Sequence, residues 1–427
     1  MANHTQFSDL RSRRVAGSLV LVWLVAIIGG PTILASTAAH SQTLSVIHRF
    51  SGPDGSHPQA GVTIRGGILY GTTPCLEECA GAGSIYQIRY AGSDWVYTPI
   101  SFFSAGGDGP EARVVFGPDS HLYGTTESGG PRSAGLVFNL TPPATICKTA
   151  NCFWTEKVLY EFTGSPDGAY PGGGDLVWDT TGNIYGTTIL GGTLGLGTVY
   201  QMTKSGDNWT EMPIYSFTGL DGQQPYAGAI PDGNGNLLGT TTAGGLYGSG
   251  TVFELTYNQG SGWTEMVLYS FQNLSDGQWP FAGLISDGAG NLYGATTDGG
   301  GGGGGTVFEL SPVGDTWAFT LLYSFNGKQG QGCGPSASLT MDSSGNLYGT
   351  TLCDGSNSLG NVFKLANTQN GWKYTSLHDF TGSFDGAKPA SNVTFDTDGN
   401  LYGTAVGGGT ITPICHIGCG TVWMIKP

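Results

Sequence analysis

The chain has 427 residues, of which 75 are glycine, and charged residues make up only 11%. Aromatic residues also make up 11%, which excludes a disordered tail, and glycine does not recur at every third position, which excludes collagen. The formal net charge is −15, with 16 basic residues, and this scarcity of basic side chains argues against nucleic acid or an anionic membrane as a partner, because phosphate contacts need clustered lysine and arginine.

Residues 1–41 have the pattern of a secretory signal peptide. Three arginines lie between positions 11 and 14, an apolar run covers 15–28, and small residues follow up to Ser41. The run is short for a transmembrane helix, although a retained anchor stays open. We expect an exported protein, cleaved after Ala39 or Ser41, that is secreted, periplasmic or on the cell surface.

Seven copies of one unit follow, over 44–427. The phrase Leu-Tyr-Gly-Thr-Thr recurs with small changes at spacings of about 55 residues, which indicates a repeat architecture. The second residue of each copy is Tyr70, Tyr123, Tyr185, Leu238, Tyr293, Tyr348 or Tyr402. One spacing is longer because 142–152 form an insertion.

Each unit reads as four short strands. In the fourth unit they cover 227–231, 237–242, 251–256 and 263–271, with Gly, Asn and Asp between them and no helical period. Four such strands predict an antiparallel sheet. Seven sheets of this size predict an all-β, seven-bladed β-propeller that forms one domain over 44–427.

The two ends of the repeat region fit a closed ring. Residues 44–50 match the end of the fourth strand of a unit, and 420–426 match the third strand. The last unit therefore lacks a fourth strand that the N-terminal segment can supply. This three-plus-one closure would pair two otherwise open sheet edges.

The repeat resembles a known family. Its successive motifs are Gly-Asn-Leu-Tyr-Gly-Thr-Thr, Gly-Gly, Gly-Thr-Val-Phe-Glu-Leu, Trp-Thr-Glu, Val-Leu-Tyr-Ser-Phe and Asp-Gly-x-x-Pro. Together they are similar to the GloVer tandem repeat of exported bacterial proteins. The resemblance implies an exported or surface protein whose biochemical role is undefined.

Two families of links between strands should share one face of the ring. The link between blades carries Asp-Gly-x-x-Pro, and the link between the second and third strands carries Gly pairs. Carboxylates around one mouth could hold a calcium ion or bind sugar hydroxyls, whereas the alternative is that each caps its own turn. These residues are Asp54, Asp108, Asp167, Asp221, Asp276 and Asp385.

The third residue after the proline should face a crowded central channel. It is small in six units, namely Gly61, Gly174, Gly228, Gly283, Ser338 and Asn392. Arg113 is the exception, and Asp108, Glu111 and His57 lie near it in sequence. A charge at that depth needs a ligand or a partner. The alternative to a ligand is neutralisation by the rim aspartates.

Eight cysteines fit an oxidising exterior. Their spacing suggests the pairs Cys75/Cys79, Cys147/Cys152, Cys333/Cys353 and Cys415/Cys419. The alternative is a four-cysteine metal site made by the two Cys-x-x-x-Cys pairs beside His416. We also expect the six tryptophans that open the fourth strands, from Trp95 to Trp372, to pack between blades.

No motif of a hydrolase, zinc protease or phosphate-binding enzyme occurs in the sequence. We therefore expect a monomeric, non-enzymatic protein that presents a loop-lined face to a glycan or a protein. The alternative is a carbohydrate- or lactone-active hydrolase or lyase that uses the sector near Arg113. No cofactor and no resident metal are expected, apart from the calcium alternative at the rim.

Overall fold

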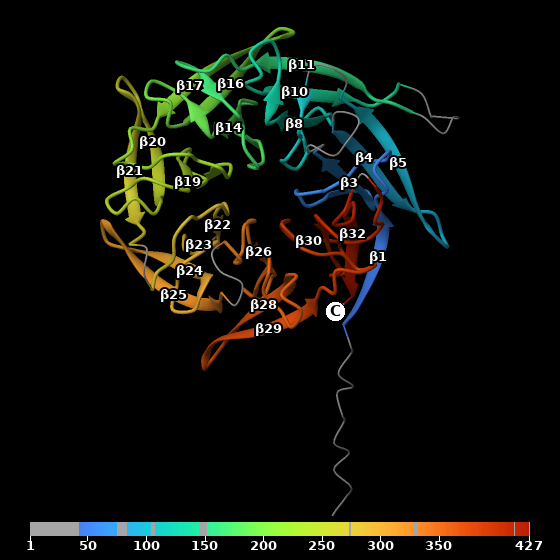
Figure 1. Ribbon diagram of the computed structural model, residues 1–427. Coiled ribbons are helices and arrows are strands. Elements are labelled where there is room, and N and C mark those ends of the chain that lie inside the picture. The colour runs from blue at the N-terminus through green and yellow to red at the C-terminus, as the bar shows by residue number, and fades with distance from the viewer. Residues whose placement is uncertain are drawn as a thin grey trace, which may run out of the picture. The chain divides into compact units, whose positions relative to one another are not determined.

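A computed structural model describes residues 42–74, 83–103, 107–144, 152–272, 275–327, 332–413 and 415–426. The predicted signal peptide lies outside these residues. Within them the secondary structure is entirely β, and seven four-stranded antiparallel sheets surround a central channel (Figure 1). The all-β class and the seven-bladed propeller are thus confirmed.

Each blade is named here by its number, and its strands by the letters a to d from the channel outward. Blade 1 contains β2 (Thr63–Arg65), β3 (Ile68–Thr73), β4 (Ser84–Tyr90) and β5 (Trp95–Phe102). Blade 2 contains β7 (Val115–Phe116), β8 (Leu122–Thr126), β10 (Leu136–Thr141) and β11 (Thr155–Glu161). Blade 3 contains β13 (Val177–Trp178), β14 (Ile184–Thr188), β16 (Thr198–Ser205) and β17 (Asn208–Ser216).

The remaining blades repeat this order. Blade 4 contains β18 (Ile230–Pro231), β19 (Leu237–Thr241), β20 (Thr251–Asn258) and β21 (Gly262–Ser270). Blade 5 contains β22 (Ile285–Ser286), β23 (Leu292–Thr296), β24 (Gly303–Val313) and β25 (Thr316–Asn326). Blade 6 contains β26 (Thr340–Met341), β27 (Leu347–Thr351), β28 (Asn361–Thr368) and β29 (Gly371–Asp379). Blade 7 contains β30 (Thr394–Phe395), β31 (Leu401–Ala405), β32 (Thr421–Lys426) and β1 (Thr43–Arg49).

The ring closes in blade 7. Strand β1 pairs antiparallel with β32, from Thr43 opposite Lys426 to Arg49 opposite Thr421, so the first described strand lies beside the last (Figure 1). The predicted three-plus-one closure is confirmed. It satisfies the backbone groups of two strands that would otherwise be open edges.

Tryptophan side chains join neighbouring blades. Trp154 of blade 2 lies 5.9 Å from Tyr70 of blade 1, measured between ring centroids, and Trp263 of blade 4 lies 6.1 Å from Tyr185 of blade 3. Three further tryptophans repeat this contact, and Trp317 packs in the cluster that contains Leu238, the residue in place of tyrosine in blade 4. The predicted packing between blades is therefore confirmed.

The first threonine of the repeat phrase adds a polar contact between blades. Thr72 of blade 1 donates a hydrogen bond of 3.1 Å to the carbonyl oxygen of Ala112 in blade 2. The same bond forms from Thr187, Thr240, Thr350 and Thr404 to the next blade. Since these hydroxyls are buried, the bond both satisfies them and fixes the spacing of the blades.

Links on one face of the ring also pair with each other. Strand β6 (Gly107–Asp108) pairs with β9 (Ser128–Gly129), and β12 (Gly168–Ala169) pairs with β15 (Leu190–Gly191). Single bridges take their place in blades 4, 5 and 7. The expectation that the two link families meet on one face is thus correct, and this face is called the link face below.

Candidate functional site

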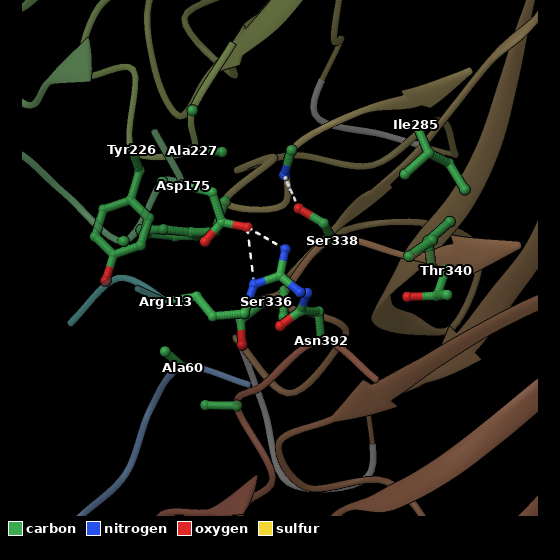
Figure 2. A pocket seen from close by; sticks show the side chains of 18 of the residues that line it. Ala60, Arg113, Asp175, Tyr226, Ala227, Ile285, Ser336, Ser338, Thr340 and Asn392 are labelled. Carbon is green, nitrogen blue, oxygen red and sulfur yellow. Dashed lines mark hydrogen bonds and ion pairs between the residues drawn. The ribbon is translucent and has the colours of Figure 1, made fainter. Parts of the chain in front are cut away.

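A cavity of about 1130 Å³ occupies the channel, and residues from all seven blades line it (Figure 2). Its wall consists mainly of the a strands and the residues that lead into them. In each blade, one residue of the a strand pairs with the tyrosine of the repeat phrase, or with Leu238 in blade 4. These seven residues are Thr63, Val115, Val177, Ile230, Ile285, Thr340 and Thr394. The residues two positions earlier form the waist of the channel.

The waist corrects one sequence expectation. Blade 3 has an extra glycine in Gly172–Gly174, so the residue two positions before Val177 is Asp175 and not Gly174. The waist therefore contains Gly61, Arg113, Asp175, Gly228, Gly283, Ser338 and Asn392. Its small residues are required by crowding, because a Cβ atom on Gly61 would lie 2.3 Å from Oδ1 of Asn392.

Arg113 and Asp175 form an ion pair at the waist. Nε of Arg113 donates to Oδ2 of Asp175 at 3.0 Å, and a terminal nitrogen contacts the same oxygen (Figure 2). The other terminal nitrogen lies 3.5 Å from Oγ1 of Thr394. The side chains are 24% and 29% exposed. The charge of Arg113 is thus balanced inside the channel by a neighbouring blade, and not by the rim aspartates.

A second polar cluster lies where the channel meets the link face. Gln59 donates a hydrogen bond of 3.3 Å to one oxygen of Glu111, and the Tyr226 hydroxyl donates one of 3.0 Å to the other. The charge of the Glu127 carboxyl also acts on Glu111. Burial, and then repulsion by Glu127, raise the pKa of Glu111 to about 7. These groups come from blades 1, 2 and 4.

Glycines of blade 3 let Tyr226 reach this cluster. A Cβ atom on Gly173 would lie 2.8 Å from Cε1 of Tyr226, and one on Gly172 would lie 2.7 Å from the Tyr226 carbonyl oxygen. Side chains at these two positions would therefore block the tyrosine. Tyr226 of blade 4 thus crosses blade 3 to contact Glu111 of blade 2, a contact that joins two blades that are not neighbours in the ring.

Aromatic side chains continue from Tyr226 around the mouth. Its ring packs edge to face with Phe281 of blade 5, with 5.2 Å between centroids, and Trp279 also lines the cavity. Trp279 adopts a positive φ of 56° directly before Pro280. We call Tyr226, Trp279 and Phe281 the aromatic wall. Lys388 of blade 7, whose side chain is exposed, lines the same cavity.

The rim aspartates predicted from Asp-Gly-x-x-Pro lie in their own turns. Each accepts a hydrogen bond from a backbone N–H just after a d strand and contacts a tyrosine hydroxyl or histidine nitrogen of that strand. For example, Asp221 accepts from Thr218 N at 2.8 Å and from the Tyr215 hydroxyl at 2.6 Å. The same pattern holds for Asp54, Asp167, Asp276 and Asp385. These contacts account for the turns, and ligand contact by these residues stays a prediction.

Asp108 differs from the sequence-based alignment. Asp108 pairs with Ser128 in the way that Ala169 pairs with Leu190, so it is the equivalent of Ala169 and not of Asp167. His57 is buried and its backbone N–H donates to the Cys419 carbonyl oxygen at 2.8 Å. Of the predicted sector, Glu111 and Arg113 line the cavity, whereas His57 is not among the described residues that line it.

Two predicted disulfides are present. Cys333 is bonded to Cys353, which joins the two links of blade 6, and Cys415 is bonded to Cys419. Cys152 is disulfide-bonded, while Cys75, Cys79 and Cys147 lie outside the described residues. The four-cysteine metal site is wrong, because a disulfide leaves Cys415 and Cys419 without a thiolate.

Among the described residues, no three or more histidine, cysteine or acidic side chains lie together in a way that could hold a metal ion. The same part of the chain contains no helix that is long and apolar enough to cross a membrane.

Solved structures share the fold at low identity. The chain is 14% identical to PorZ, a surface component of the type IX secretion system of Porphyromonas gingivalis, with a TM-score of 0.50, and the match covers 90% of this chain but only 48% of PorZ. An ulvan lyase is 13% identical with a TM-score of 0.52, over 86% of this chain and 91% of the lyase. These likenesses establish the propeller fold alone.

Sequence comparison identifies the family. No curated protein matches the chain. The Gloeobacter/Verrucomicrobia repeat matches three times in tandem, over residues 28–171, 145–288 and 261–427. The matches confirm the resemblance noted from the repeat motifs. The chain therefore belongs to the Gloeobacter/Verrucomicrobia repeat family.

Proposed function

We propose that this protein is exported and binds a glycan at the mouth of its central channel. The observation that carries the proposal is the aromatic wall, which lies beside the polar groups of Glu111 and Gln59 in one sector of the ring. Aromatic faces pack against the C–H faces of sugar rings, and carboxyl and amide groups bind sugar hydroxyls. The cavity, at about 1130 Å³, is slightly larger than typical ligand pockets of roughly 300–1,000 Å³.

Three features support export. The N-terminal pattern predicts a signal peptide, and the chain contains disulfides. Disulfides persist in oxidising compartments outside the cytosol. The disulfides and the bacterial repeat family are consistent with an extracellular protein.

Glycan cleavage is the second candidate, and Glu111 is the observation in its favour. A carboxyl group with a raised pKa inside a cavity is a typical general acid or base. The charge of Glu127 acts on Glu111. A glycosidase needs two carboxyls about 5–9.5 Å apart, whereas a lyase that uses Glu111 or Arg113 has no such requirement.

Titration calorimetry of the mature protein against soluble hexasaccharides tests the proposal. The panel comprises cellohexaose, laminarihexaose, xylohexaose, maltohexaose and hexa-N-acetylchitohexaose. We expect at least one to bind, and Trp279→Ala and Phe281→Ala each to weaken binding by about tenfold or more. Tyr170→Ala is the matched control, because Tyr170 has the equivalent turn position and a φ of 57° but does not line the cavity.

The outcomes separate the two candidates. Binding without chain shortening, lost in Trp279→Ala and kept in Tyr170→Ala, supports a binding protein. Release of shorter or unsaturated products, abolished in Arg113→Ala or Glu111→Gln, would support the enzyme instead. Failure of the whole panel to bind would overturn the glycan proposal.

A further inference from the structure

The aromatic wall ends at a part of the mouth that carries only small residues. In blade 5 the residues on either side of the proline are Trp279 and Phe281, whereas in blade 6 they are Gly334 and Ser336. Both aromatic residues and Ser336 line the cavity. Since glycine and serine take up far less space than two aromatic rings, the cavity is open beside the wall. We call this part of the cavity the blade 6 sector.

Lys388 of blade 7 lies on the other side of the blade 6 sector. Lys388 and Trp279 both precede a proline, and their φ angles are 53° and 56°. The N–H of Lys388 donates to the Leu359 carbonyl oxygen at 2.7 Å, and that of Trp279 donates to the Ser249 carbonyl oxygen at 3.1 Å. The fold therefore holds the two backbones in the same way, and the sector has an aromatic ring on one side and a lysine on the other.

Polar side chains continue from this sector to the waist of the channel. Ser336 and Asn392 line the cavity, and neither side chain makes a hydrogen bond with another described residue. Ser338, at the waist, accepts a hydrogen bond from the backbone of Gly283 (Figure 2). One terminal nitrogen of Arg113 points to blade 7, where its contact with Thr394 is a long one of 3.5 Å. The sector therefore offers hydrogen-bond donors at several depths.

The charges that line the cavity are divided between two sides of the ring. The acidic side chains of the described lining are Glu111 of blade 2 and Asp175 of blade 3, and the latter is paired with Arg113. Blades 5, 6 and 7 contribute no acidic side chain to this lining, and Lys388 forms no ion pair with a described residue. The blade 6 sector is therefore locally positive, although the whole chain carries a net charge of −15.

We propose that the glycan bound at this mouth is acidic, and that the carboxylate of a uronic acid residue occupies the blade 6 sector, bound by Lys388, while a sugar ring packs on Trp279. This inference rests on the proposed function and names its substrate class. The Lys388 ammonium and the Ser336 hydroxyl donate to the carboxylate oxygens, and such charge-assisted hydrogen bonds are stronger than those to a neutral hydroxyl.

The negative net charge of the protein does not oppose this binding strongly. Charges farther away than about 8–10 Å are largely screened at ordinary ionic strength, so the nearby lysine decides the local attraction. Lys388 is exposed, so it pairs with a carboxylate without the large desolvation cost of a buried ion. One carboxylate in a local site also needs no clustered basic residues, unlike the phosphates of a nucleic acid.

Matched pairs of sugars test the inference. Each hexasaccharide of the panel that carries C6 hydroxymethyl groups is compared with its counterpart in which these groups are oxidised to carboxylates. Titration calorimetry should show that, for the sugar backbone that binds, the oxidised member binds about tenfold more tightly than the neutral one. The preference should shrink at high ionic strength, because the lysine is exposed.

Lys388→Gln should abolish the preference and leave the affinity for the neutral sugar within about twofold. Glutamine suits this backbone, because Gln224 has the equivalent position in blade 4 with a φ of 58°. Lys373→Gln is the matched control. Lys373 is an exposed residue of β29 outside the cavity lining, so this variant makes the same change in net charge. It should keep the preference for the oxidised sugar.

Three results would overturn the inference and leave the proposed function intact. They are an oxidised sugar that binds no more tightly than its neutral parent, a preference that survives in Lys388→Gln, and a preference lost equally in Lys373→Gln. Failure of every sugar to bind, neutral or oxidised, would instead overturn the proposed function.

Discussion

Arg113 and Asp175 show how one inserted residue changes the chemistry of the channel. The sequence identified Arg113 as an exception among small residues, but its partner was missed because alignment from the proline placed Gly174 at the waist. Counting back from the paired strand places Asp175 there. When a link changes length, the register of the a strand is defined by its pairing with the b strand. This pairing is visible only in the structure.

The ion pair leads to a prediction for stability. Asp175→Ala removes the carboxylate that balances Arg113, whose side chain is 24% exposed. We expect the free energy of unfolding to fall by about 1–2 kcal/mol, because a partly buried charge is left without its partner. Urea denaturation measures the change.

A double variant provides the control for this prediction. Arg113→Ala with Asp175→Ala should lose less stability than the sum of the single variants, because neither charge is then left alone. Strictly additive losses would show that the two side chains do not stabilise each other.

At the scale of single elements, two d strands carry half-buried glutamates that lie near the turn aspartates. Burial, and then the charge of Asp167, raise the pKa of Glu211 in β17 to about 7, and burial with Asp221 does the same for Glu265 in β21. Phe319 and Tyr374 occupy the equivalent positions in blades 5 and 6. The repeat thus tolerates either an aromatic ring or a protonated carboxyl at this site.

These glutamates predict how stability depends on pH. The folded protein keeps their protons up to about pH 7, whereas the unfolded chain releases them near the ordinary value of 4.5. Their contribution is therefore fully present below about pH 4.5 and is lost as pH rises through 7. We expect a lower melting temperature at pH 8 than at pH 5, measured by calorimetry.

The matched variant is Glu211→Gln with Glu265→Gln, which removes both titrations and keeps the shape of the side chains. The difference in melting temperature between pH 5 and pH 8 should shrink in this variant. An undiminished difference would assign the pH dependence to other groups, such as Glu111.

The two described disulfides predict unequal effects on stability. Cys333 and Cys353 are separated by 20 residues, and Cys415 and Cys419 by 4. In the chain-entropy account, loss of the longer loop costs about 3 kcal/mol and loss of the shorter about 2 kcal/mol. Denaturation of the paired Cys→Ser variants measures both, and a larger loss for the shorter loop would contradict this ranking.

The secondary-structure elements and their order are the part of this protein that the sequence predicts best. Strands, blade order, closure by β1 and the pairing of links all follow from the repeat and its turn residues. The repeat pattern could not predict the hydrogen bond from Tyr226 to Glu111, because that contact depends on residues that depart from the repeat in three different blades. Gly172, Gly173 and Glu127 look like ordinary link residues until the chain is folded.

At the scale of the whole molecule, seven similar blades form one ring, but the residues at its mouth do not follow sevenfold symmetry. The aromatic wall comes from blades 4 and 5, and Glu111 comes from blade 2. The turn aspartates, in contrast, repeat around the ring and make the same contacts in each turn. Repetition therefore builds the scaffold, and the unique residues define the proposed site.

The binding stoichiometry of the mature protein tests this account most directly. Titration calorimetry with the hexasaccharide panel should give one bound sugar per chain, with affinity lost in Trp279→Ala and retained in Tyr170→Ala. Several equivalent sugars per chain, or equal losses in the two variants, would contradict a single site at the aromatic wall.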